Sequence, residues 1–414
     1  MNGVPLRRNR DFVLLQLGQG LSTLGSTSTY IAYPLLVLTL THSPAKAGVV
    51  GFANVLPYAL FALFAGVVAD RVDRKRLMIA MDLVRAAAMA SVVAALAAGV
   101  VTFWQVAAVA FVEGTAFVFF NIAEVGALRS VVPAYQLQEA AAAEQSRYAA
   151  VTLAGPSLGG ALFGLGRSLP FLADAVSYAA SILTLIWMRT PFQEARERDP
   201  APLWLQIREG IAWLWANAYL RTSALIFAGQ NFVFSGIYLI FVVVSKRDGL
   251  SPAAIGALIA VFGGASLAGA LAAPRIARLL SMRAIMLGNQ WLSAAIILCA
   301  LAPGPYLLLG CVLPLAFLSP SLNSVVVGYR TAITPDHLVG RVSSVARNLA
   351  QIAAPLGPLA AGFLLGAYSS RSTLLALGSI ALALALWTSV SPSIRNAPSL
   401  SELDEPGHPA TMEA

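Results

Sequence analysis

The chain has 414 residues, of which 58% are hydrophobic and only 11% are Asp, Glu, Lys or Arg. Soluble domains carry about 25% charged residues, so this composition excludes an ordinary soluble protein and predicts an all-α protein that crosses a membrane many times. The net charge of +8 first suggests nucleic-acid binding, but the arginines lie in short clusters between long apolar runs, which excludes that class.

Apolar runs long enough to cross a bilayer, about 20 residues each, follow one another along the whole chain. The first run comes after Arg7, Arg8 and Arg10; it is too long for a signal-peptide core, so we expect it to be retained as a span. The twelve expected transmembrane helices are 12–38, 46–69, 76–98, 103–126, 146–166, 169–189, 220–245, 252–274, 283–302, 305–328, 342–366 and 371–390.

Basic residues favour the cytoplasmic loops of membrane proteins. With the N-terminus inside, 21 of the Lys and Arg residues lie on the cytoplasmic side, 5 lie on the outer side, and Arg85 lies within a span. We therefore expect both termini to be cytoplasmic. The Arg-rich, Lys-poor composition favours a bacterial source, and hence the bacterial inner membrane.

The two halves of the chain repeat each other. SPAKAG at 43–48 precedes span two as SPAAIG at 251–256 precedes span eight, and GPSLGG at 155–160 is matched by GPLAAG at 357–362. Six spans followed by six in the same order form a parallel repeat, an arrangement typical of transporters. The expected domains are an N-terminal six-helix bundle (1–189), a cytoplasmic linker with an interfacial helix (190–219), a C-terminal six-helix bundle (220–390) and a disordered cytoplasmic tail (391–414).

The segment between spans two and three is unusually charged. Its pattern, Gly66-x-x-x-Asp70-Arg71-x-x-Arg74-Lys75, resembles motif A, the signature loop of the major facilitator superfamily. The resemblance implies the fold of that superfamily, in which two six-helix bundles alternately open a cavity to either side. It also implies that Asp70 faces the N-terminus of span eleven, where a carboxylate meets unpaired N–H groups.

We expect the motif A loop to hold the cytoplasmic side closed through contacts that form in only one of two states. Gly66 favours the close approach of a neighbouring helix, and Arg71 and Arg74 are expected to reach Asp82 and the acids of span four. The alternative is a loop that only orients the protein by its positive charge. The expected gating residues are Gly66, Asp70, Arg71, Arg74, Lys75, Asp82, Arg85, Glu124 and Arg129, with Glu124 paired to Arg129.

Span five carries Gly155, Pro156, Gly159 and Gly160, which resemble the core of the superfamily's antiporter signature, motif C. The runs RSVVPAYQLQEAAAAEQS and PFLADAVSY are similar to the drug:proton antiporter branch that holds macrolide-efflux and enterobactin-exporter-like proteins. Close packing by these glycines on the outer half of the span would favour export, whereas ordinary helix packing is the alternative. One departure is Ser26, since that branch often has an aspartate there, so no span-one acid is expected to carry a proton.

An ionisable residue within a span is costly and is usually functional. Glu113 lies near the middle of span four and shares a helical face with Phe117, Phe120 and Glu124. We predict that Glu113 is the proton-coupling site; the alternative is a glutamate paired with an arginine or a hydroxyl for structure alone. Asp174 is interpreted as a carboxylate at the start of span six.

Polar and aromatic residues on several spans are candidates for contact with a substrate, although aromatic packing is an alternative. By resemblance, spans one, four, seven and ten line the cavity. A cavity with many rings and few fixed charges suits a bulky amphipathic compound that is neutral or weakly charged. The candidates are Ser22, Ser26, Tyr33, Asn54, Tyr58, Phe117, Phe120, Gln230, Asn231, Phe234, Tyr238 and Asn323.

The sequence has no phosphate-binding loop and no histidine or cysteine spacing for a metal, so we expect neither an enzyme nor a cofactor. The function expected is secondary active export of a drug-, macrolide- or siderophore-like molecule, coupled to protons and performed by a monomer in the lipid bilayer. Two alternatives remain open: an importer or lipid flippase on the same fold, and a receptor or accessory protein that transports nothing.

Overall fold

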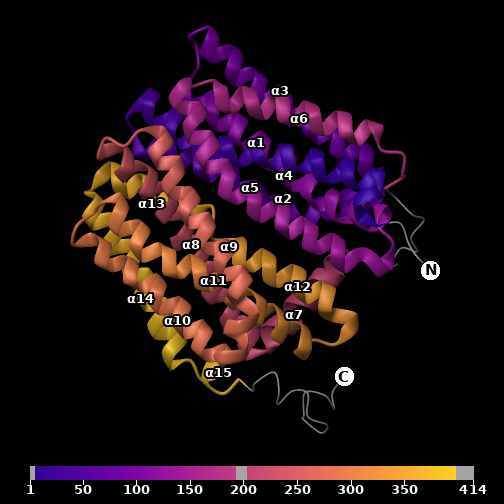
Figure 1. The fold of residues 1–414 in the computed structure, drawn as a ribbon. Coiled ribbons are helices and arrows are strands. Elements are labelled where there is room, and N and C mark those ends of the chain that lie inside the picture. The colour runs from indigo at the N-terminus through magenta and orange to yellow at the C-terminus, as the bar shows by residue number, and fades with distance from the viewer. Residues whose placement is uncertain (1–4, 193–202, 398–414) are drawn as a thin grey trace. The chain divides into compact units, whose positions relative to one another are not determined.

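The computed structural model describes residues 5–192 and 203–397, and its regular structure in these ranges is entirely helical (Figure 1). The α-helices are α1 (Arg10–Thr41), α2 (Pro44–Arg71), α3 (Arg74–Ala97), α4 (Phe103–Val131), α5 (Leu137–Leu165), α6 (Leu169–Trp187), α7 (Leu203–Ala216), α8 (Ala218–Arg247), α9 (Pro252–Leu279), α10 (Met282–Ala294), α11 (Pro305–Ile333), α12 (Asp336–Gln351), α13 (Leu356–Ala367), α14 (Ser370–Val390) and α15 (Pro392–Arg395). Short 3₁₀ helices are η1 (Leu6–Arg8), η2 (Ala134–Gln136) and η3 (Ala295–Ala300).

Each predicted span corresponds to a helix or to two consecutive helical segments. Within the described ranges, eleven of these segments are long and apolar enough to cross a membrane. The twelfth is α1, whose 32 residues include a run of serines and threonines that lowers its hydropathy. The predicted all-α membrane fold with twelve spans is therefore confirmed.

The repeated Ser-Pro sequence begins a helix in the same way in both halves. The Ser43 side chain accepts a hydrogen bond from the backbone N–H of Lys46 at 3.3 Å, and Ser251 accepts one from Ala254 at 3.2 Å. In each case the proline that follows is the first helical residue, where its missing N–H costs nothing. This local chemistry explains why helix starts could be predicted from the sequence.

The predicted span 342–366 is interrupted in the structure. It forms α12 and α13, with a turn at 352–355 between them. Pro355 lies at the break, and a proline there lacks the N–H that would donate to the carbonyl of Gln351. The proline also disfavours a helical conformation in the preceding residue, which explains why the helix ends before it.

The chain folds as two compact units, which we call the first unit (Met1–Arg198 with Ser245–Gly263) and the second unit (Asp199–Val244 with Gly264–Ala414). In the first unit, α1 packs against α5 and α6, α2 packs against α4, and α3 contacts both α4 and α6 (Figure 1). In the second unit, α10 packs against α11 and α14, and α7 packs against α12. The unit boundaries fall inside α8 and α9, and the division into bundles at 1–189 and 220–390 stays a prediction.

The helix predicted in the linker is α7, which contacts α12 within the second unit. Gly210 lies against the backbone of Arg341, and the Arg341 guanidinium pairs with Glu209. The predicted disordered tail is wrong for its first residues, since α15 forms there and buries Ile394 among apolar side chains. The rest of that tail, 398–414, and the linker residues 193–202 lie outside the described residues.

Candidate functional site

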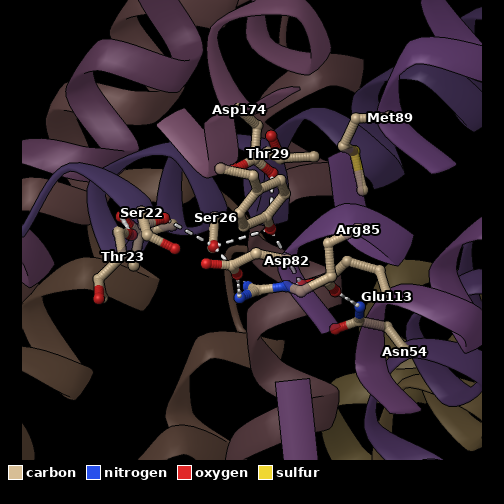
Figure 2. A network of polar contacts seen from close by, with 12 residues as sticks. Ser22, Thr23, Ser26, Thr29, Asn54, Asp82, Arg85, Met89, Glu113 and Asp174 are labelled. Carbon is tan, nitrogen blue, oxygen red and sulfur yellow. Dashed lines mark hydrogen bonds and ion pairs between the residues drawn. The ribbon is translucent and has the colours of Figure 1, made fainter. Parts of the chain in front are cut away.

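Arg85, on α3, is the centre of a buried charge cluster in the first unit. Its side chain is only 2% exposed. One guanidinium nitrogen, Nη1, lies 3.4 Å from Asp82 Oδ1, and the other, Nη2, lies 3.1 Å from Glu113 Oε1 on α4. A fully desolvated charge is stable only when it is paired, so the arginine and the two acids depend on one another. Figure 2 shows these side chains pointing toward a common centre.

Polar groups on the neighbouring helices add hydrogen bonds to Arg85 and Glu113. Asn54, on α2, donates a hydrogen bond from Nδ2 to Glu113 Oε2 at 2.7 Å. Ser26, on α1, accepts one from Arg85 Nη2 at 2.9 Å and lies 2.9 Å from the carbonyl of Ser22, to which it donates. These bonds link α1 and α2 to the ion pair between α3 and α4. Hydrogen bonds to charged groups are among the stronger ones in proteins.

Tyr178, on α6, links the cluster to a third buried acid. Its ring stacks on the Arg85 guanidinium, with 4.1 Å between the guanidinium carbon and the ring centroid, which is a cation–π contact. Its hydroxyl lies 3.0 Å from Ser26 Oγ, 3.2 Å from Asp174 Oδ2 and 3.4 Å from Glu113 Oε1. Asp174 also accepts a hydrogen bond from Ser177 Oγ at 3.2 Å.

This position of Asp174 corrects the sequence-based interpretation. Asp174 is not a carboxylate at the helix start, because α6 begins at Leu169 and has no acid in its first turn. It is fully buried and is bonded to side chains of its own helix. Tyr178 was not among the predicted site residues. Its spacing of four residues from Asp174, which places both on one helical face, is the signal that could have identified it.

The cluster contains more acid than base. Asp82, Glu113 and Asp174 would together carry three negative charges if all were ionised, against the single positive charge of Arg85, which leaves a net charge of −2. An uncompensated buried ion costs several kcal/mol even after relaxation of its surroundings.

The motif A residues lie in contacts that differ from those expected. Arg74 pairs with Asp70 at 3.0 Å and donates to the carbonyls of Ala69 and Phe192. Lys75 donates to the carbonyl of Met188 at 2.7 Å, at the C-terminal end of α6. The expected contact of Arg71 or Arg74 with Asp82 is wrong, because Asp82 pairs with Arg85 near the middle of α3.

Two further expectations about the motif A region need correction. A Cβ atom on Gly66 would meet nothing within 4 Å, so no helix in the described ranges uses this glycine for close approach. Glu124 pairs with Arg147 of α5, at 3.0 Å, and not with Arg129. The contact expected between Asp70 and the residues near 342–344 stays a prediction.

Three glycines of α5 lie in close helix contacts within the first unit. A Cβ on Gly155 would collide with the side chain of Thr27, and one on Gly159 with the carbonyl of Ser28, both on α1. A Cβ on Gly160 would collide with the carbonyl of Pro252, at the start of α9. Pro156 lies on the face of α5 that contacts α9, as Gly160 does. Its carbonyl oxygen is the atom that a Cβ on Gly256 would meet first.

The substrate-contact candidates are distributed over both units. In the first unit, Ser22, Ser26 and Asn54 bond within or beside the charge cluster, and Phe117 and Phe120 flank the Arg85 guanidinium at 5.6 and 5.8 Å. Tyr33 is buried against Phe171, and Tyr58 packs beside the apolar cluster of Ala62, Ala65 and Val118.

In the second unit, Gln230 donates to Asn289 and accepts from Gln290 at 2.9 Å, while Asn231 donates to the carbonyl of Ala350 at 2.9 Å. Phe234 and Asn323 are exposed and Tyr238 is half-buried. Within the described residues, no cluster of acids, histidines and cysteines has the composition to hold a metal ion.

Known proteins resemble this chain over most of its length. It is 29% identical over 387 residues to the multidrug efflux pump Tap of Mycolicibacterium fortuitum, covering 90% of this chain and 93% of that protein. It is 27% identical over 239 residues to macrolide efflux protein A of Streptococcus pyogenes, covering 56% and 58% of the two chains.

Solved structures with the same fold include an inward-facing, occupied bacterial homologue of the human lysosomal transporter Spinster, with a TM-score of 0.73, 15% identity and coverage of 95% and 98% of the two chains. A D-xylose–proton symporter matches with a TM-score of 0.68, 14% identity and coverage of 91% and 96%. At such low identity these likenesses concern the fold.

The family model described as "Transmembrane secretion effector" matches residues 3–408, nearly the whole chain. Together with the twelve-span fold and the efflux relatives, this match agrees with the resemblance inferred from motifs A and C, and it indicates a transporter and not an enzyme. The chain belongs to the transmembrane secretion effector family of the major facilitator superfamily.

Proposed function

We propose that this protein is a proton-coupled exporter of bulky amphipathic small molecules in the bacterial inner membrane, and that it works by alternating access with both termini in the cytoplasm. The observation that carries the proposal is the buried Arg85–Glu113 pair, with 3.1 Å between its charged atoms. The names of the efflux relatives support drug-like and macrolide-like substrates. The excess of basic residues on one side of the predicted spans supports the orientation.

The proposed coupling follows from the competition for Arg85. Ionised Glu113 holds the guanidinium and thereby ties α4 to α3. When Glu113 binds a proton, its attraction to Arg85 weakens, and Asp82 remains as the charged partner at 3.4 Å. Because both acids contact the same guanidinium, the arrival of a proton changes the packing of α3 against α4. A change of a few kcal/mol is sufficient to shift a two-state equilibrium.

The motif A loop and the α5 glycines have proposed roles on the two sides of the membrane. The motif A residues, with Asp70 facing the residues near 342–344, stabilise the state that is closed to the cytoplasm. The tight contacts of Gly155 and Gly159 with α1 stabilise closure toward the outside. A transporter that alternates between these closures needs no bound cofactor, only a proton gradient and a substrate.

The test uses inverted membrane vesicles, in which export appears as uptake. Vesicles containing the wild-type protein should accumulate radiolabelled erythromycin when the vesicle interior is made more acidic than the medium. An uncoupler should abolish the accumulation. Glu113→Gln keeps the shape of the side chain but cannot cycle a proton, so gradient-driven uptake should fall by on the order of 100-fold. Glu139→Gln, at an exposed position of α5, is the control and should retain the wild-type rate.

Two results would contradict the proposal. Full gradient-driven uptake by Glu113→Gln would show that this glutamate does not couple protons. Uptake by right-side-out vesicles in place of inverted ones would establish import, and the export direction would be wrong.

A further inference from the structure

The hydroxyl of Tyr178 lies between two carboxyl groups that belong to different helices. It is 3.2 Å from Asp174 Oδ2 on its own helix and 3.4 Å from Glu113 Oε1 on α4. A hydroxyl can donate one proton while it accepts another. We propose that Asp174 is a second proton-binding carboxyl of this site and that the Tyr178 hydroxyl passes protons between Asp174 and Glu113.

The transfer conserves charge and atoms. The O–H bond of the Asp174 carboxyl breaks and its proton binds to the Tyr178 oxygen, while the original phenolic proton moves to Glu113 Oε1. Asp174 becomes a carboxylate, Glu113 becomes neutral, and Tyr178 is neutral before and after the step. No oxidant, reductant or bound ion takes part.

Among the described residues, the Tyr178 hydroxyl is the one that contacts both acids, and the other groups around it are as follows. From α3, Arg85 faces Glu113 and lies under the Tyr178 ring, and Asp82 is bound to Arg85 on the side away from Glu113. From α1, Ser26 Oγ contacts the Tyr178 hydroxyl at 3.0 Å. Tyr33, a buried phenol on α1, directs its hydroxyl toward Met89 Sδ at 3.9 Å and therefore lies outside the path.

The depths of the two acids give the path a direction, which rests on the proposed function and its orientation. Both α4 and α6 begin on the outer side in that orientation. Asp174 is the sixth residue of α6 and Glu113 is the eleventh of α4, so they lie about 8 Å and about 15 Å along their helices at 1.5 Å per residue. Asp174 is thus closer to the outer water, and it accepts the proton first.

Infrared spectroscopy of the purified full-length protein in lipid nanodiscs tests this inference without any transport substrate, because a protonated carboxyl has a carbonyl band that a carboxylate lacks. The wild-type protein near neutral pH should show this band, and Asp174→Asn should lose the larger part of it. Tyr178→Phe retains the ring on Arg85 and removes only the hydroxyl. It should keep the Asp174 part of the band, but the part that Glu113→Gln removes should respond to a pH jump at least about tenfold more slowly, as expected when a positioned proton-transfer group is lost.

Tyr219→Phe is the matched control, since it removes a buried hydroxyl of the second unit that contacts Met282 Sδ, and it should respond as fast as the wild type. An unchanged band in Asp174→Asn, or a wild-type response in Tyr178→Phe, would overturn the inference. Band loss in a folded Asp174→Asn protein supports the inference even where uptake occurs in right-side-out vesicles, a result that overturns the export direction of the proposed function alone.

Discussion

In the first unit, α3 carries Asp82 and Arg85 as its ninth and twelfth residues, and in the second unit α10 carries Gln290 and Ser293 at the same two positions. All four side chains are buried. The correspondence extends to the helices that begin each half of the repeat, since Ser22 and Gln230 are both the thirteenth residues of α1 and α8. The repeat has therefore kept polar residues at equivalent positions.

The chemistry at these positions differs between the units. In the second unit the buried contacts are made by amides and hydroxyls: Gln290 donates to Gln230 at 2.9 Å, Gln230 donates to Asn289, and Asn289 donates to Ser319 at 3.1 Å. In the first unit the equivalent contacts are ion pairs around Arg85. We refer to these groups as the amide cluster and the charge cluster.

A buried polar site can hold helices together without any charge, as the amide cluster does. The amide cluster joins its helices with neutral hydrogen bonds, each worth about 1 kcal/mol, although the buried Gln290 Oε1 accepts none from the described residues. The charge cluster also joins helices, but any of its ions that lacks a partner lowers the free energy of unfolding by several kcal/mol. Stability alone therefore does not favour charged residues at this site. The presence of charge in only one of two equivalent sites supports the proposal that the charge cluster has a function beyond packing.

The largest expected effect comes from removing the single cation of the charge cluster. Arg85→Met leaves Asp82 and Glu113 without a counter-charge, and the free energy of unfolding in detergent should fall by about 3–5 kcal/mol. The double variant Arg85→Met with Glu113→Gln should recover part of this loss, because one unpaired charge is removed. Equal stability of the wild type and Arg85→Met would mean that the cluster is not held by this arginine.

The converse experiment introduces a charge into the amide cluster. Gln290→Glu places a carboxyl at a position that is 1% exposed and whose hydrogen-bond partner is the amide of Gln230. The free energy of unfolding should fall by about 3 kcal/mol, which a lower midpoint of thermal unfolding at neutral pH would measure. Gln290→Met, similar in size but uncharged, is the control and should cost less. Tolerance of the glutamate at neutral pH would contradict the contrast between the clusters.

A smaller effect distinguishes a hydrogen bond to a charged group from one to a neutral group. Asn54→Ala removes the 2.7 Å bond to Glu113 and should reduce the free energy of unfolding by about 1.5–3 kcal/mol. Asn231→Ala removes a bond of 2.9 Å to the carbonyl of Ala350 and should cost about 1 kcal/mol. Chemical denaturation of the two variants side by side measures the difference, and equal losses would mean that Glu113 is not ionised.

The smallest effect on stability is expected outside both clusters. The Asp70 side chain is 66% exposed in its pair with Arg74, and exposed pairs of this spacing contribute about 0.3–0.5 kcal/mol. Asp70→Asn should therefore insert and unfold like the wild type while erythromycin transport falls, because the proposed gating contact is lost. Unchanged transport would leave the motif A loop with an orienting role only.

Much of the fold could be predicted from the sequence because its signals are local. Twenty apolar residues in a row specify a span, and a serine before a proline specifies the start of α2 and of α9 wherever the rest of the chain lies. The same local reasoning identified Glu113 and Arg85 as ionisable residues within predicted spans. The break before Pro355 was missed because a window of apolar residues does not register one missing N–H.

By itself, then, the sequence determined the class of protein, the number of spans and the two ionisable residues at the centre of the site. Only the tertiary structure decided their partners: Asp82 with Arg85 and not with the motif A arginines, Glu124 with Arg147, and Tyr178 between Asp174 and Glu113. The reason is that these groups lie on different helices or turns, and helix rotation and depth are set by packing such as that of Gly155 against Thr27. Hydropathy along one helix carries no information about those angles.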